Sequence, residues 1–198
     1  MKAITEPERS LETQDHDQHG HTKRKVTIVV GLGNDLLSDD GVGLYIARRL
    51  RTLLDPDHYE VLELSVGGME MVEHLVGYRR AAVIDACRTG RLAPGTLRRY
   101  RPEDFSNSLR LGSFHTIGFV TALELARMLG ANLPERIDVF AIEAEDVETV
   151  HEGCTPAVAT SIQAAANEIA QILTTEVETQ EWCRDRTTTG KTPVSPMR

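Results

Sequence analysis

The chain has 198 residues, of which 40% are hydrophobic and 26% are charged, and this balance is typical of a single globular domain with its own core. Its formal net charge of −8 argues against nucleic acid or an anionic membrane as the partner, because proteins that bind these normally carry a basic surface. No apolar run approaches the roughly 20 residues that a membrane-spanning helix needs. The N-terminus does not have the pattern of a signal peptide, and three scattered cysteines without a CxxC pair favour a reduced, cytoplasmic protein.

Two polar tails flank the predicted domain. Residues 1–25 are mixed in charge and include the histidine-rich stretch DHDQHGH, which we interpret as part of a disordered, solvated tail. Residues 175–198 are rich in Thr, Glu and Pro and lack apolar periodicity, so a flexible C-terminal tail is predicted there. The folded domain is expected to span residues 26–174.

Strand and helix patterns alternate between the tails. Strands are predicted at residues 26–30, 59–66, 81–84, 96–101 and 137–142. Helical spacing of apolar residues predicts helices that begin near Val42, Met69, Phe119 and the pair Thr155-Pro156. This alternation predicts an α/β fold, a three-layer sandwich in which a central, mostly parallel (mixed) five-stranded sheet lies between helices on both faces. Ligands of such sheets bind beyond the carboxyl ends of the strands.

The first predicted strand runs into the loop GLGNDLLSDDGVG, residues 31–43. A dinucleotide-binding loop needs a third glycine where this chain has Leu36, and the GK[ST] of a phosphate loop is missing. Asp39 and Asp40 would also repel phosphates, so a nucleotide-binding domain is the weaker interpretation. Adjacent helical residues point about 100° apart, so only one of the two aspartates can face a common site. Gly41 and Gly43 favour the close approach of another chain.

Two further polar residues are expected at the same edge of the sheet. Asp85 closes the apolar strand VID, and His115 precedes the helix that is predicted from Phe119. Taken singly, Asp85 could cap a loop and His115 could be structural. Together with one aspartate of the first loop they suggest a divalent metal site with open positions, suited to Ni, Zn, Mn or Fe. We expect the nearby Cys87 to be a small buried residue rather than a nucleophile.

Five segments in this order and spacing resemble the hydrogenase maturation proteases, the endopeptidases that trim the large subunits of nickel-iron hydrogenases. The resemblance covers about residues 26–173. Its segments are GLGNDLLSDDGVG, SVGGMEMVEHL, VIDAC, FHTIGF and EGCTP.

The resemblance implies a set of site residues, a metal and a partner. It assigns Asp40, Asp85 and His115 as the catalytic residues that contact a metal, and it treats Asp39 mainly as an acid at the start of a helix. The residues expected to line the substrate cleft are Gly31, Gly33, Asn34, Asp39, Gly41, Gly67 and Gly68. The metal is nickel, supplied by a [NiFe]-hydrogenase large-subunit precursor, and no organic cofactor is expected. The protein is expected to act as a monomer.

The chemistry implied by the resemblance is the removal of a C-terminal extension from the precursor after nickel insertion. Nickel could serve recognition only or polarise the scissile carbonyl, and Asp40 or Asp85 could activate water. The sequence has no HExxH helix and no evident Ser/His/Asp or Cys/His nucleophile arrangement. The alternative function is a non-catalytic nickel-binding or chaperone module that acts on the same precursor.

Overall fold

The computed structural model describes residues 27–106 and 114–189, and the side chains of residues 27–104 and 118–176. The predicted tail 1–25 lies outside the described residues. The strands are β1 (Thr27–Leu32), β2 (Tyr59–Leu64), β3 (Arg80–Cys87), β4 (Leu97–Tyr100) and β5 (Arg136–Glu143). The helices are the 3₁₀ helix η1 (Ser38–Gly41), then α1 (Val42–Leu53), α2 (Gly68–Leu75), α3 (Pro102–Ser106), α4 (Phe114–Met128) and α5 (Pro156–Thr189).

The five strands form one mixed sheet in the order β2-β1-β3-β5-β4. β1 pairs in parallel with β2 and β3, and β3 pairs in parallel with β5, whereas β4 runs antiparallel to β5. The prediction of a mostly parallel five-stranded sheet is therefore confirmed. β1 and β3 are neighbours in the sheet. From β1 the chain continues to β2 on one side, and from β3 it continues to β4 and β5 on the other side. A topological switch point therefore lies between the carboxyl ends of β1 and β3.

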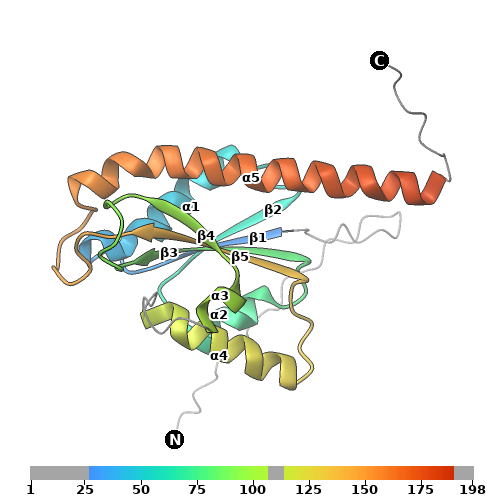
Figure 1. Ribbon diagram of the computed structural model, residues 1–198, viewed down its shortest axis with the longest axis horizontal. Coiled ribbons are helices and arrows are strands. Elements are labelled where there is room, and N and C mark those ends of the chain that lie inside the picture. The colour runs from blue at the N-terminus through green and yellow to red at the C-terminus, as the bar shows by residue number, and fades with distance from the viewer. Residues whose placement is uncertain (1–26, 107–113, 190–198) are drawn as a thin grey trace, which may run out of the picture.

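Helices cover both faces of the sheet and give the three layers that were predicted (Figure 1). α1 and α5 pack on one face, over a core that includes Val29 of β1 and Ile46 of α1. α2 and α4 pack on the other face, over a core that includes Val30 of β1 and Phe119 of α4. The alternation of Val29 and Val30 between the two cores follows from the period of two along a strand. All six residues of β1 are buried, which explains its unbroken apolar sequence.

The last helix continues far past the expected end of the domain. α5 runs to Thr189, so residues 175–189 of the predicted C-terminal tail have helical backbone. Helical backbone of this length was not apparent from the sequence, because the apolar periodicity stops near Leu173, the last buried apolar residue of the helix among those described. Figure 1 shows the end of α5 extending beyond the sheet.

A cluster of charged residues fastens α5 to the sheet. Asp138 of β5 is fully buried and forms ion pairs with Arg80, Arg99 and Arg136, and Glu176 of α5 pairs with the same three arginines. Burial alone would raise the pKa of the Asp138 carboxyl, but the hydrogen bond from Arg80 and the charges of Arg99 and Arg136 bring that pKa below its ordinary value. Arg99, from the edge strand β4, thus helps to hold the sheet and α5 together.

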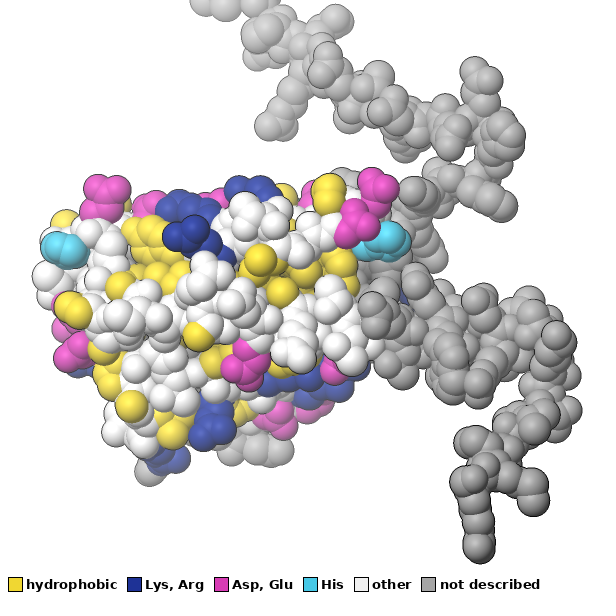
Figure 2. All heavy atoms as spheres, turned by 90° about the horizontal axis from the view of Figure 1, so that it is seen from above, with side chains coloured by type: hydrophobic (Ala, Val, Ile, Leu, Met, Phe, Trp, Pro, Cys, Tyr) yellow, Lys and Arg dark blue, Asp and Glu magenta, His cyan; other side chains and the backbone are white. Residues whose placement is uncertain are grey.

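Figure 2 looks onto the face that α5 covers. The basic side chains on that face are interspersed with acidic and uncharged ones. In the part of the chain that the structure describes, no helix combines the length and the apolar character needed to cross a membrane.

Candidate active site

The glycines of the loop after β1 let α1 pack directly against the ends of two strands. A Cβ atom on Gly43 would lie 2.3 Å from the carbonyl oxygen of Leu32 and 2.4 Å from that of Ile84. A Cβ atom on Gly31 would meet the carbonyl oxygen of Gly43 at 2.3 Å. The space that these glycines leave is filled by the protein's own backbone, and not by another chain as the sequence had suggested. The first turn of α1 therefore packs directly against the carboxyl ends of β1 and β3, at the switch point.

Asp40 lies in η1, directly before α1. Its Oδ2 accepts a hydrogen bond from the backbone N–H of Asn34 at 2.8 Å, and its carbonyl oxygen would be 1.9 Å from a Cβ atom on Gly33, whose φ of 138° also favours glycine. Asp40 is half-buried. η1 packs against β3, so the loop brings Asp40 to the carboxyl end of the neighbouring strand.

Asp85 lies where β1 and β3 separate. Pairing between these strands ends at Gly31 and Ile84, and Asp85 is the next residue of β3. The prediction that Asp85 closes its strand is wrong by two residues, because β3 continues to Cys87 and pairs there with Glu143 of β5. The side chain of Asp85 is 2% exposed, and its Oδ1 accepts the N–H of Ala86 at 2.9 Å. Topology thus places Asp40 and Asp85 at the same carboxyl edge of the sheet.

Asp39 lies in the first turn of η1, as an acid at the start of a helix was expected to, and it also forms contacts beyond that helix. It was interpreted mainly as an acid at the start of a helix, but no side-chain cap hydrogen bond is formed at the start of η1 or of α1. The carboxylate of Asp39 is fully buried and accepts hydrogen bonds from the backbone N–H groups of Glu145, Asp146 and Thr155 and from the Thr155 hydroxyl. Of the neighbouring aspartates, Asp40 is therefore the more accessible.

The third predicted member of the site is His115. It is the second residue of α4, so the expectation that it precedes the helix is wrong by a few residues. Its side chain lies outside the described side chains. The first turns of α4 pass beside the start of α2, because a Cβ atom on Gly118 would lie 3.8 Å from the Cα atom of Gly68. The backbone at His115 and the predicted cleft residues Gly67 and Gly68 therefore belong to one region, which follows β2 at the carboxyl edge of the sheet.

A buried carboxylate that sequence reasoning missed is Glu143, at the end of β5. Glu143 is 1% exposed, and it accepts hydrogen bonds from the N–H and hydroxyl of Thr89 and from the N–H of Gly90. It thereby holds the connection that follows β3, at residues four and five positions beyond Asp85. The sequence does contain a signal for Glu143, since it is an acid that closes an apolar strand, as Asp85 was predicted to be.

The surroundings of the cysteine near the site disfavour its ionisation. Burial and the adjacent carboxylate of Glu143 raise the pKa of the Cys87 thiol to about 12, so it stays protonated near neutral pH, and the thiolate is the reactive form. The prediction that Cys87 is a small buried residue is confirmed, since it is 7% exposed.

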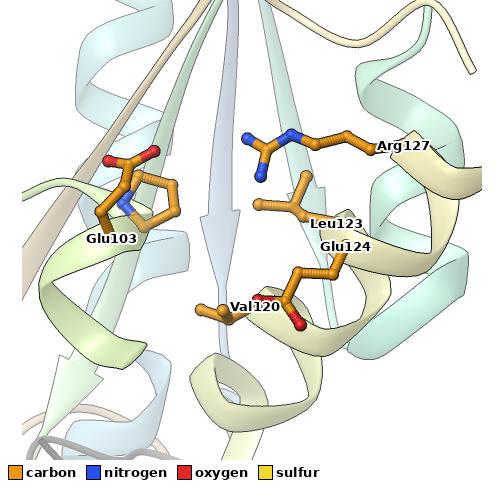
Figure 3. A pocket seen from close by; sticks show the side chains of 6 residues that line it. Glu103, Val120, Leu123, Glu124 and Arg127 are labelled. Atoms are coloured by element: carbon orange, nitrogen blue, oxygen red, sulfur yellow. The ribbon is translucent and has the colours of Figure 1, made fainter. Parts of the chain in front are cut away.

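Among the side chains that the structure describes, which do not include that of His115, no group of three or more His, Cys, Asp and Glu is placed to hold a metal ion. A shallow hollow between α3 and α4 is lined by Pro102, Glu103, Val120, Leu123, Glu124 and Arg127 (Figure 3). None of the predicted site residues lines that hollow. The carboxyl edge of the sheet near β1 and β3, where Asp40 and Asp85 lie, is the candidate active site.

The fold places this chain among α/β proteins with a mixed sheet. Its switch point carries acidic residues that follow or close two neighbouring strands, β1 and β3. The family model for hydrogenase maturation protease matches residues 44–172. The chain belongs to this family of peptide-bond hydrolases, which confirms the resemblance found in the sequence. The match contains Asp85 and His115 and begins after Asp40.

Individual relatives agree with the family match. The hydrogenase 2 maturation protease of Escherichia coli is 29% identical over 151 residues, which cover 74% of this chain and 89% of that protein. The structure of the hydrogenase maturating endopeptidase HybD from E. coli has a TM-score of 0.66 at 28% identity, and the match covers 93% of that chain and 76% of this one. HybD from Thermococcus kodakarensis has a TM-score of 0.59 at 26% identity, with coverage of 98% of that chain and 75% of this one.

Proposed function

We propose that this protein is the endopeptidase that removes the C-terminal extension of a nickel-loaded [NiFe]-hydrogenase large-subunit precursor. The proposal is carried by the family match together with the placement of Asp40, in η1 after β1, and Asp85, next to the end of the β1–β3 pairing, at the same edge of the sheet. This edge of the sheet is where α/β proteins bind their ligands.

Asp40, Asp85 and His115 contact the nickel ion of the bound precursor in this proposal. Two carboxylate oxygens and an imidazole nitrogen form a donor set that suits nickel. The half-buried Asp40 is the more accessible carboxylate, and Asp85 is nearly fully buried. Because the precursor supplies the nickel, the protease requires neither a resident metal nor an organic cofactor.

Asp40 and Asp85 also provide the acid–base chemistry of the proposal. Asp40 or Asp85, near the scissile bond, would take a proton from the attacking water and pass it to the leaving amine, and nickel bound in the precursor would supply Lewis-acid polarisation of the scissile carbonyl. A protonated Cys87 favours direct attack by water over an acyl-enzyme formed on that thiol. The cleft around the bound precursor would be formed by Asn34, Gly67 and Gly68, whereas Gly31, Gly33, Asp39 and Gly41 are buried and would shape it from beneath.

A monomer in the cytoplasm is the expected working form. Cys87 and Cys154 are free thiols, and burial, together with the charge of Asp39, raises the pKa of Cys154 to about 12. Unpaired thiols are typical of a reducing compartment.

The proposal is tested by incubating the purified protein with large-subunit precursors that carry nickel and with the same precursors without nickel. Mass spectrometry then measures the precursor. We expect the loss of one C-terminal peptide from the nickel-loaded form only. If the protein binds nickel-loaded precursor and leaves it uncut, it is a nickel-binding or chaperone module and the protease assignment is wrong for this chain.

A further inference from the structure

The fully buried carboxylate of Asp39 joins two connections that are distant in the sequence. Its Oδ1 accepts the N–H of Thr155 at 2.7 Å, and its Oδ2 accepts the Thr155 hydroxyl at 3.0 Å. The same Oδ2 accepts the N–H groups of Glu145 at 2.9 Å and Asp146 at 3.0 Å. These donors all come from the connection between β5 and α5. One side chain therefore holds the loop after β1 against the loop after β5.

Backbone hydrogen bonds extend the same contact. The N–H of Asp39 donates to the carbonyl of Asp146, the N–H of Ser38 donates to the carbonyl of His151, and the N–H of His151 donates to the carbonyl of Leu36. Ser38 has a φ of 47°, in the left-handed region that a residue with a Cβ atom seldom adopts. Such a conformation persists only where the surrounding contacts impose it, and here the contacts come from the β5–α5 connection.

Asp40 is the next residue after Asp39. The position of Asp40 is therefore linked to the contact that Asp39 makes with the β5–α5 connection. The Asp40 carbonyl oxygen lies so close to Gly33 that only glycine fits there, and the Asp40 carboxylate meets the N–H of Asn34. The backbone of Asp40 is thus confined between Gly33 on one side and the held residue Asp39 on the other. A shift of the Asp39 backbone would therefore change the direction in which the Asp40 carboxylate points at the edge of the sheet.

We infer that Asp39 is a positioning residue, which sets the direction of the Asp40 carboxylate by binding the β5–α5 connection through Thr155. The inference rests on the proposed function, because it takes Asp40 as the group that meets the nickel of the precursor. Asp39 is buried and acts through its neighbour. Its removal is expected to lower processing as much as the removal of Asp40, whereas an acid that only favoured a helix start would have a mild effect.

Thr155→Val tests the inference with little change of shape, since valine replaces the hydroxyl by a methyl group. Thr155→Ser is the matched variant that keeps the hydroxyl. Thr160→Val is the control in the first turns of α5, the helix that begins directly after Thr155, because it removes an exposed hydroxyl that donates to the carbonyl of Ala157. With nickel-loaded precursor, we expect Thr155→Val to lower kcat about 10-fold or more, as small misplacements of catalytic groups do, while KM changes little. Thr155→Ser and Thr160→Val should stay close to the wild type.

A second measurement separates this inference from the proposed function. Amide hydrogen exchange of residues 36–41 needs no precursor, and we expect faster exchange in Thr155→Val than in Thr155→Ser. Unchanged exchange would overturn the inference. So would a Thr155→Val protein with a lower Tm and an unchanged kcat, because Asp39 would then stabilise the fold only. If the wild type leaves every precursor uncut while exchange responds as expected, the proposed function fails and the structural contact stands.

Discussion

Gly43→Ala is the substitution whose effect the structure defines most closely. The new Cβ atom would lie 2.3 Å from the carbonyl oxygen of Leu32 and 2.4 Å from that of Ile84. Both obstacles are backbone atoms of paired strands, which cannot rotate away as a side chain could. The start of α1 would therefore have to move by about 0.7 Å to restore even a separation of 3.0 Å.

Overpacking is expected to lower the free energy of unfolding of Gly43→Ala, and the higher helix propensity of alanine offsets part of that loss. Inserting a methyl group into a closely packed site costs about 3 kcal/mol at the upper end of its usual range, and alanine returns up to about 1 kcal/mol relative to glycine in a helix. The expected net loss is about 2 kcal/mol, which lowers Tm by roughly 4–8 °C in a protein of this size. Thermal and urea unfolding followed by circular dichroism measure both quantities.

Gly118→Ala is the matched control. Gly118 lies within α4, and a Cβ atom on it would make only an ordinary contact with the Cα atom of Gly68 at 3.8 Å. Helix propensity alone should raise its stability by up to about 1 kcal/mol. A Gly43→Ala protein at least as stable as the wild type would refute the view that this glycine serves the contact of α1 with the sheet.

Two more predictions concern ionisable groups away from Asp40. Burial tends to raise the pKa of Glu176, but its arginine partners lower it below the ordinary value, so the stabilisation from Glu176 is present above pH about 4.5 and is lost as pH falls through the lowered pKa. The stability difference between the wild type and Glu176→Gln, measured by urea unfolding, should thus be smaller at pH 3 than at pH 7, and a constant difference would argue against the ion pairs. Cys87→Ala should retain processing, because a thiol with a pKa of about 12 cannot supply a thiolate near neutral pH; loss of processing in a folded Cys87→Ala protein would mean that the thiol takes part in the reaction.

The sheet was predictable because its signals are local. The buried apolar run of β1 and the alternation of strands and helices led to the observed layers, and the observed β1 extends only two residues beyond the predicted end at residue 30. The start of α4 was missed because its first turn, at Phe114–Ile117, lacks the apolar spacing that begins at Phe119. The length of α5 was missed because a charged contact through Glu176 fastens it there, and ion pairs between distant segments leave no periodic pattern in a sequence.

The site divides in the same way. Asp85 could be found because an acid next to a buried strand is conspicuous and strand ends meet at one edge of the sheet. Asp39 could not be told from Asp40 by pattern, since its partners Glu145, Asp146 and Thr155 lie 106 to 116 residues away. The family resemblance selected Asp40, and the three-dimensional contacts show that Asp39 is buried and Asp40 is the more accessible of the two.

The central claim is that Asp40 and Asp85 carry out the cleavage of a nickel-loaded precursor. The most direct measurement compares the wild type with Asp40→Asn and Asp85→Asn in the processing of that precursor by mass spectrometry, with circular dichroism to verify that each variant is folded. The account predicts release of one C-terminal peptide by the wild type and none by either folded variant. Cleavage at the wild-type rate by both variants would contradict it.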